Sequence, residues 1–312
     1  MKKVILAAPR GYCAGVDQAV KIVERALETL GTPVYVRKEI VHNRHVVEEL
    51  ATRGAVFVDS EAEIPDGSVC IFSAHGVSPS HRRRAEEKNL QVIDATCPLV
   101  TKVHLEAKRF ARAGRKIVLV GHEGHEEIEG TFGEAPENTV VVEDAAQLDK
   151  LKLDPNESVA YLTQTTLSVD DTLGVVEGLR ERFSNIAGPR SDDICYATQN
   201  RQVAVKAIAP HADVVLIVGA RNSSNSNRLV EVAKVAGTDA HLVPDAAELD
   251  PQWLEGCDAV GVSSGASAPE VLVDRLLERL STLGYSEVET REVTTEDVTF
   301  SLPPWLREDR PA

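Results

Sequence analysis

The chain has 312 residues, of which 43% are hydrophobic and 27% are charged, and its formal net charge at pH 7 is −15. A chain of this length has more apolar residues than a single hydrophobic core usually contains, so we expect two or three domains. Such an acidic chain lacks the positive surface on which proteins that bind nucleic acid or anionic lipid depend, and we expect neither kind of partner.

The first predicted element is a buried strand in the segment KKVILAAP, at 2–9. Its apolar run is too short for the core of a secretory signal, and it stops at Pro9 and Arg10. No apolar run in the sequence approaches the roughly 20 residues that span a bilayer. We therefore expect a cytoplasmic protein, in which the five cysteines serve catalysis, metal binding or packing rather than a disulfide framework.

Apolar runs of strand length alternate with segments of helical period over the first third of the chain. Strands are predicted at 2–9, 33–40, 68–76 and 91–97, and helices at 17–31, 44–54, 79–89 and 98–114. Continuous apolar strands separated by helices are typical of a parallel sheet that is covered on both faces. The pattern predicts an α/β fold.

Similar strand-and-loop segments recur at a spacing of roughly a hundred residues, which is typical of one domain. KIVLVGHEGHEEIEG and VVLIVGARNSSNSNRL repeat the N-terminal strand and its RGYCAGV loop, while SVCIFSAHG, SVAYLTQTT and DAVGVSSGAS form a second set. We expect three similar α/β units at 1–97, 98–194 and 195–280, and a tail at 281–312 that packs back on the body. Ligands of open parallel sheets bind beyond the carboxyl ends of the strands, so the polar loops should surround one central cavity.

Three of the cysteines, Cys13, Cys97 and Cys195, follow predicted strands in polar loops, one at each boundary of the repeat. Cys70 lies inside an apolar run and Cys257 precedes one, so both are interpreted as packing residues. A structural zinc site would show close cysteine or histidine pairs and four ligands, which are absent here. An iron-sulfur cluster fits three thiolates, and one iron would then lack a protein ligand and could bind a substrate oxygen.

Polar residues at other predicted strand ends indicate an anion-binding site. His42, His75 and His125 occupy such loops, and Asn222, Ser223, Ser224 and Asn225 stand at a helix start, with Ser267 in a similar segment. Serine and asparagine there are often only N-caps, but four in a row exceed what one cap needs. The sequence has no GxxxxGK or GxGxxG motif, so a P-loop or nicotinamide site lacks support.

Eight ordered motifs, spread over nearly the whole chain, resemble those of the 4-hydroxy-3-methylbut-2-enyl diphosphate reductase family (LytB/IspH). They are RGYCAGVDQAV, VHNRHVV, SAHGVSP, DATCPLVTKVH, GHEGHEEIEGT, TQTTLSVDDT, NSSNSNRL and SGASAPE. The resemblance implies three α/β units with parallel sheets, arranged pseudo-threefold around a central [4Fe-4S] cluster. It also implies the last step of the non-mevalonate isoprenoid pathway, a two-electron reductive dehydroxylation that yields isopentenyl and dimethylallyl diphosphate.

The resemblance also implies roles for residues of this chain. The cluster ligands are Cys13, Cys97 and Cys195, with one cluster per chain and one iron lacking a protein ligand. The substrate-binding residues are His42, His75, His125, Thr165, Thr166, Ser223, Ser224, Asn225 and Ser267. Glu127 is the proton donor and Thr165 orients the substrate hydroxyl. The family commonly has proline where this chain has Glu126. One of the two adjacent glutamates should therefore point into the cavity and the other to solvent, and the resemblance selects Glu127 for the cavity.

The reaction requires a small allylic diphosphate substrate and an external electron donor, for which the resemblance implies a ferredoxin or flavodoxin. Two other functions stay open. A quinolinate-synthase-like [4Fe-4S] enzyme would need Arg or Lys at the strand ends for a carboxylate substrate, whereas these loops carry Ser, Thr, Asn and His. A non-catalytic iron-sulfur redox sensor would need no diphosphate pocket and no internal acid.

Overall fold

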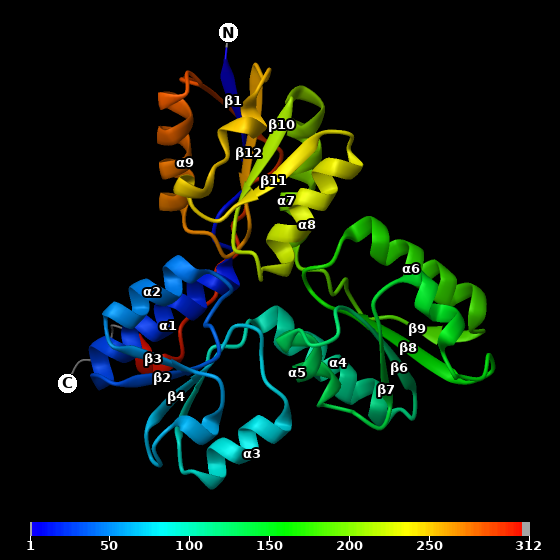
Figure 1. Ribbon diagram of the computed structural model, residues 1–312. Helices are drawn as coiled ribbons and strands as arrows, with labels where there is room; N and C mark the ends of the chain where they lie inside the picture. Colours follow the sequence, from blue (N-terminus) through cyan, green and yellow to red (C-terminus); the bar gives the residue numbers. More distant parts are fainter. Residues whose placement is uncertain (1, 308–312) are drawn as a thin grey trace. The chain divides into compact units, whose positions relative to one another are not determined.

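The computed structural model describes residues 2–307 and contains three separate parallel sheets with helices packed against them (Figure 1). Every strand pair among these residues is parallel. This confirms the predicted α/β class with three similar units. No helix in the described range is both long and apolar enough to cross a membrane.

The first and second sheets share one strand order, and the third repeats its first three positions before adding two further strands. The first sheet is β3 (Ala55–Val58), β2 (Val34–Arg37), β4 (Val69–Phe72) and β5 (Gln91–Asp94). The second is β7 (Thr139–Val142), β6 (Lys116–Val120), β8 (Ser158–Thr163) and β9 (Asn185–Ala187). The third is β11 (Asp239–Val243), β10 (Val214–Val218), β12 (Ala259–Ser264), β1 (Lys3–Ala8) and β13 (Glu287–Glu292).

Helices connect the parallel strands, as crossover connections require. Their bounds are α1 Ala14–Leu30, α2 Arg44–Thr52, α3 Pro79–Glu87, α4 Pro98–Arg112, α5 Glu126–Phe132, α6 Val169–Arg182, α7 Tyr196–Ile208, α8 Ser224–Val235 and α9 Glu270–Thr282. The eight strands and helices predicted for the first third of the chain are all present within a few residues of their predicted bounds.

The third sheet includes two strands from outside the segment 195–280 that was expected to form the third unit. Strand β1, expected in the unit 1–97, completes the third sheet, where Lys3 aligns with Ala259 of β12 and Glu287 of β13. Its uniformly apolar residues predict burial on both faces but cannot specify the neighbouring strands. Strand β13 lies in the segment expected to be a tail, and its sequence EVETRE has no apolar run because it is an edge strand with mostly exposed residues.

The residues group by contact into two compact units. Unit I comprises Met1–Val16, His42–Val46 and Tyr196–Val298, and unit II comprises Asp17–Val41, Val47–Cys195 and Thr299–Ala312. Unit I contains the third sheet, and unit II contains the first and second sheets. In unit I, alternate residues of β1 enter separate cores on the two faces of the sheet, as the period of a strand requires.

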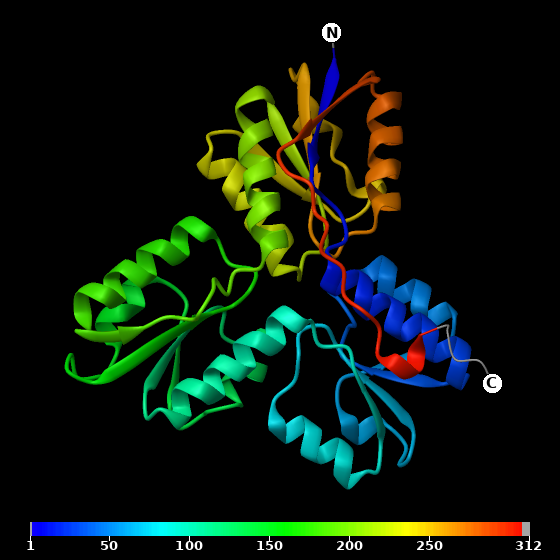
Figure 2. The same cartoon turned by 180° about the vertical axis from the view of Figure 1, so that it is seen from behind.

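Residues 299–307 lie along α1 within unit II, where Figure 2 shows them in red beside the blue helix. The Gln18 side chain donates a hydrogen bond to the Ser301 carbonyl at 2.7 Å, and Arg25 donates to the Leu306 carbonyl at 3.3 Å. Leu306 is 1% exposed and is the apolar anchor of this segment, whereas Trp305 is exposed.

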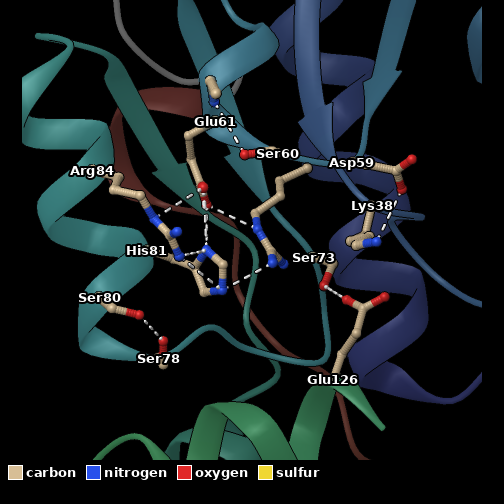
Figure 3. A network of polar contacts seen from close by, with 12 residues as sticks. Lys38, Asp59, Ser60, Glu61, Ser73, Ser78, Ser80, His81, Arg84 and Glu126 are labelled. Atoms are coloured by element: carbon tan, nitrogen blue, oxygen red, sulfur yellow. Dashed lines mark hydrogen bonds and ion pairs between the residues drawn. The ribbon is translucent and has the colours of Figure 1, made fainter. Parts of the chain in front are cut away.

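A buried ion network fastens the short helix Glu61–Glu63 to the first sheet (Figure 3). The fully buried Glu61 carboxylate lies 2.8 Å from Arg37 Nε and 2.8 Å from His81 Nδ1. Burial acts to raise the pKa of Glu61, but hydrogen bonding to His81 and the nearby Arg37 charge hold it below its ordinary value. The opposite charges pair with one another, so we interpret the network as a structural link that holds β2, α3 and the short helix together.

Candidate functional site

Cys13, Cys97 and Cys195 occupy equivalent places in the three repeats. Each immediately precedes a helix, α1, α4 or α7 respectively. Each backbone N–H donates to the carbonyl of the second residue after a strand of the same compact unit. The acceptors are Ala266 after β12 at 3.2 Å, Ala74 after β4 at 3.0 Å and Thr165 after β8 at 3.1 Å. The sequence repeat is therefore reproduced in the hydrogen bonds that hold the cysteine loops.

The environments of the five free thiols separate them into two groups. Cys13, Cys97 and Cys195 are half-buried, whereas Cys70 and Cys257 are buried. Burial raises the pKa of Cys70 to about 12 and also raises that of Cys257, which disfavours the thiolate form that binds metal. The three loop cysteines thus fit the thiolate donor set of an iron-sulfur cluster, and the two core cysteines do not. Cys13 belongs to unit I, and Cys97 and Cys195 belong to unit II.

In unit I, polar side chains collect where β10 and β12 end. Ser223 is the N-cap of α8, and its oxygen accepts hydrogen bonds from the Ser226 N–H at 3.3 Å and the Ser226 hydroxyl at 3.0 Å. The N-cap interpretation of Ser223 is therefore correct. Because both of these bonds use the oxygen of Ser223 as acceptor, they leave its own hydroxyl proton for an incoming anion.

Asn225 ties the two loops of unit I together. Its Oδ1 accepts from the Ala266 N–H at 2.8 Å, and its Nδ2 donates to Thr198 Oγ1 at 3.3 Å. The second amide hydrogen on Nδ2 can then donate to a ligand. Ser267, in the same β12 loop as Ala266, donates to the carbonyl of His42 at 2.9 Å, so unit I brings Ser267 and His42 together.

Glycine is required where these two loops meet Ser226. A Cβ on Gly219 would lie 2.2 Å from Ser226 Oγ, and one on Gly265 would lie 2.1 Å from it. A side chain at either position would displace Ser226, whose hydroxyl holds the Ser223 cap. The two glycines therefore let the strand-end loops approach closely enough to form one polar cradle.

Unit II holds the predicted acid. Glu127 lies in the first turn of α5 and is 2% exposed. One carboxylate oxygen accepts from the Thr165 N–H at 2.7 Å, and the other accepts from Thr165 Oγ1 at 2.9 Å. The structure thus brings Glu127 and Thr165 together across 38 residues of sequence. The same Thr165 accepts the Cys195 N–H through its carbonyl, so one residue touches both the acid and a predicted cluster ligand.

Burial raises the pKa of Glu127 to about 7, against the lowering effect of its bonds to the backbone and side chain of Thr165. The negative charge of Asp193 adds to the increase. Burial likewise raises the pKa of Asp193 to about 6, although Lys102 at 3.1 Å opposes this. A carboxyl with a pKa near 7 can hold a proton near neutral pH and release it, which is what a general acid requires.

Glu126 contacts a different part of unit II. It accepts a hydrogen bond from Ser73 at 3.3 Å, as Figure 3 shows, and its carboxylate lies 3.8 Å from His75 Nδ1. The adjacent glutamates therefore diverge, with Glu127 directed to Thr165 and Glu126 to the loop after β4. The expectation that the second glutamate would face solvent is wrong, because Ser73 and His75 lie against it.

Two predicted histidines of unit II lie next to each other. The rings of His75 and His125 are 5.9 Å apart and meet edge to face at 88°. His125 is the N-cap of α5, and its Nδ1 accepts from the Glu127 N–H at 3.1 Å. In neutral His125 the proton is therefore on Nε2, which makes that atom a donor. Nearby, the Gln164 amide donates to Thr166 Oγ1 at 2.8 Å and orients that hydroxyl.

The predicted binding residues occur at fixed positions after equivalent strands. The third residue after β4, β8 and β12 is His75, Thr166 and Ser267 respectively. The fifth residue after β2, β6 and β10 is His42, His125 and Ser223 respectively. Ser224 follows Ser223 as the first residue of α8 and is half-buried.

Several supporting residues were not predicted. Ser264 accepts from the Gly11 N–H at 2.8 Å and steadies the loop of Cys13, and Thr198 orients Asn225. Asp193 accepts from the Thr163 N–H at 3.1 Å and Ser73 donates to Glu126. Each forms its contact with a residue distant in sequence, so no local motif marks it. The only available signal was that Ser73 and Ser264 belong to the repeated strand-end loops.

The chain matches the family model described as LytB protein over residues 4–281. It is 59% identical over 310 residues to the 4-hydroxy-3-methylbut-2-enyl diphosphate reductase of Nocardia farcinica, covering 99% of this chain and 92% of that protein. It is also 59% identical over 311 residues to the protein of the same name from Corynebacterium diphtheriae, covering 99% and 93%. The solved structure of the E-1-hydroxy-2-methyl-but-2-enyl-4-diphosphate reductase from Plasmodium falciparum superposes with a TM-score of 0.95 at 37% identity, covering 98% of this chain and 96% of that one.

Proposed function

The chain belongs to the LytB family, and we propose that Glu127, positioned by Thr165, is the proton donor with which it reduces 4-hydroxy-3-methylbut-2-enyl diphosphate in the terminal reaction of the non-mevalonate pathway. The enzyme is an oxidoreductase, and its family carries an iron-sulfur cluster. The observation that carries the proposal is the buried carboxyl of Glu127, whose pKa is about 7 and whose two oxygens are both held by Thr165.

Cys13, Cys97 and Cys195 are the proposed cluster ligands, since they are the half-buried thiols at the equivalent loop positions. Three ligands imply a [4Fe-4S] cluster in which one iron lacks a protein ligand. When bound, such a cluster supplies single electrons and a Lewis-acid position for a substrate oxygen. The Cys13, Cys97 and Cys195 N–H groups are all engaged with carbonyls, which fixes the backbone from which each thiolate projects.

The diphosphate is bound mainly by neutral donors. Ser223 offers its hydroxyl proton and Asn225 offers its second amide hydrogen, both at the positive N-terminal end of α8. Ser224 adds a hydroxyl, Ser267 adds one when its proton turns from the His42 carbonyl to the anion, and His42, His75 and His125 add ring donors. Directed hydrogen bonds to a charged group are strong when buried, so the site needs no cluster of lysine and arginine.

The net reaction adds two electrons and two protons to the allylic alcohol and releases water. Thr165 Oγ1 donates to the ionised Glu127 carboxylate; when Glu127 is protonated this bond reverses, and the Thr165 hydroxyl can donate to the substrate oxygen and so align it with the acid. Glu127 transfers its proton to the departing hydroxyl through Thr165, which turns a poor leaving group into water. A second proton reaches either end of the remaining allyl fragment, giving isopentenyl or dimethylallyl diphosphate.

The reaction requires an electron donor, which we propose is a ferredoxin or flavodoxin. The free thiols of this chain fit the proposal of a cytoplasmic location, because reducing conditions there keep cysteines available for a cluster.

The proposed function is tested by assaying anaerobically purified protein with 4-hydroxy-3-methylbut-2-enyl diphosphate and reduced methyl viologen. We expect dye oxidation with formation of both five-carbon diphosphates, identified by mass spectrometry. Cluster-loaded protein that binds the diphosphate without consuming electrons would contradict the proposal and favour a redox sensor. Activity on a dicarboxylate substrate without dye oxidation would favour the quinolinate-synthase-like alternative.

A further inference from the structure

Helix α4 carries an excess of positive charge on a strongly acidic protein. It contains Lys102, Lys108, Arg109 and Arg112 and a single acid, Glu106. This is the largest cationic excess of any α-helix in the described range. Against a net charge of −15 for the whole chain, α4 is the helix most able to attract a negatively charged partner.

The acids that pair with these cations lie beneath the surface. Arg109 pairs with Glu106, Lys108 with Glu134 at 2.9 Å, and Lys102 with Asp193 at 3.1 Å. All three carboxylates are buried to a much greater extent than their cationic partners. Lys108 and Arg109 therefore present their positive ends to solvent, and the exposed Arg112 adds a further charge beyond them. The Lys102 ammonium is less exposed and also donates to the Ser191 and Asp192 carbonyls.

An apolar residue lies among these cations. Leu105 is 60% exposed. Lys102 precedes it by one turn, and Arg109 and Arg112 follow it by one and two turns on the same face of the helix. A small apolar centre within a charged rim is the usual anatomy of a transient protein interface.

This face of α4 lies close along the chain to Cys97, which the proposed function, on which this inference rests, makes a cluster ligand. Helix α4 begins at the residue after Cys97. Leu105 lies eight residues beyond Cys97, which is about 12 Å along a helix axis. Figure 2 shows α4, in teal, in the foreground of its sheet.

We propose that the exposed face of α4, formed by Lys102, Leu105, Lys108, Arg109 and Arg112, is the docking surface for an acidic one-electron carrier protein. In each encounter the reduced iron-sulfur or flavin carrier loses one electron and the cluster of the enzyme gains it. Two encounters supply the two electrons that cleavage of the carbon-oxygen bond consumes, and the protons come from the enzyme and solvent.

The experiment uses the cluster-loaded full chain and a purified acidic bacterial ferredoxin, whose binding is measured by calorimetry at several salt concentrations. Leu105→Ser and Arg112→Glu change the docking face at residues outside the proposed catalytic machinery. Leu173→Ser, on the exposed side of α6 at 54% exposure, and Arg83→Glu, on α3, are matched controls.

We expect Leu105→Ser combined with Arg112→Glu to weaken ferredoxin binding about tenfold at low salt and to flatten its salt dependence. Turnover driven by methyl viologen, which needs no docking, should stay at the parental rate, and both controls should bind like the parent. Parental ferredoxin affinity in the double variant would overturn the proposal, as would an equal loss in the two control variants. If viologen fails to drive the parent enzyme, the proposed function fails, while the binding measurement still decides whether α4 is the docking face.

Discussion

At equivalent positions of their loops, the two compact units carry different chemistry. Ser223 of unit I and His125 of unit II are both the fifth residue after a strand and the N-cap of the next helix. Next to Ser223 lie two further neutral side chains: Ser226 donates a hydrogen bond to Ser223, and Asn225 accepts one from the Ala266 N–H. Behind His125 lies Glu127, a buried carboxyl whose pKa burial raises to about 7.

The difference indicates that one backbone plan serves two tasks. Around the start of α8, unit I holds hydroxyl and amide groups, whose protonation does not change near neutral pH, and this part of the unit suits binding of a charged ligand. Unit II contains the buried group that can exchange a proton near neutral pH, and it suits chemistry. We therefore expect substitution of Ser223 or Asn225 in unit I to alter substrate affinity, and substitution of Glu127 in unit II to alter turnover.

The largest effect is expected at the cysteines, which both units share. Cys13→Ser, Cys97→Ser and Cys195→Ser should each abolish or cripple the cluster, because each removes one of only three thiolates. Iron content and visible absorption near 400 nm after anaerobic purification measure this. Cys70→Ser is the matched control, since Cys70 is buried in β4 and should affect only stability. A full cluster in Cys195→Ser would remove that residue from the ligand set.

The next effect tests unit II. Glu127→Gln retains the shape of the side chain but cannot deliver a proton, so turnover should fall at least about 100-fold while the cluster and diphosphate binding persist. Glu126→Gln is the control. Because Glu126 contacts Ser73 and His75 rather than Thr165, it should change KM by only a few fold and leave kcat near the parental value. The reverse order of effects would exchange the roles of the two glutamates.

A smaller effect tests unit I. Combined replacement of Ser223, Ser224 and Asn225 by Ala should raise the inhibition constant of inorganic diphosphate by roughly 100-fold, because each charge-assisted hydrogen bond contributes about 1.5 to 3 kcal/mol and losses are not additive. Asn227→Ala, whose side chain bonds the Arg221 carbonyl at the rim of the same helix, is the control. An unchanged inhibition constant in the triple variant would show that these residues only cap the helix and do not bind diphosphate.

The smallest effect concerns stability. The pKa of Glu127 is about 7 in the folded chain and 4.5 ordinarily, so the folded state retains a proton that the unfolded state releases between these pH values. The free energy of unfolding should therefore decrease as pH rises from 4.5 to 7, by about 3 kcal/mol at most. Glu127→Gln should remove this loss and melt at a higher temperature than the parent at pH 8. Equal melting temperatures at pH 8 would show that ionised Glu127 is not destabilising.

Sequence could predict the parts of the fold and site that follow local patterns. The alternation of apolar strands and helices indicated the α/β class, and the repeated loops indicated where Cys13, Cys97 and Cys195 stand. The neighbours of β1 could not be predicted, because an apolar strand carries no information about which parallel partners it joins. Strand β13 was missed because it is an edge strand with mostly exposed residues.

The contacts of Glu126 and Glu127 could not be predicted from the sequence. Their adjacency in sequence leaves open which one is buried, and the first turn of α5 decides it by directing Glu127 to Thr165, 38 residues away. Glu126 accepts a hydrogen bond from Ser73, 53 residues away, and no local sequence pattern predicts this contact. Motifs could predict which residues belong to the site, whereas the neighbours that set the pKa of a residue could be identified only from the folded structure.

Infrared difference spectroscopy of the parent against Glu127→Gln, across pH 5 to 9, tests most directly whether the Glu127 carboxyl keeps its proton until the pH approaches 7. We predict a protonated carboxyl band that belongs to Glu127 and disappears with a midpoint near pH 7, in parallel with a fall in turnover as pH rises. A Glu127 carboxyl that is already ionised at pH 5 would contradict this prediction.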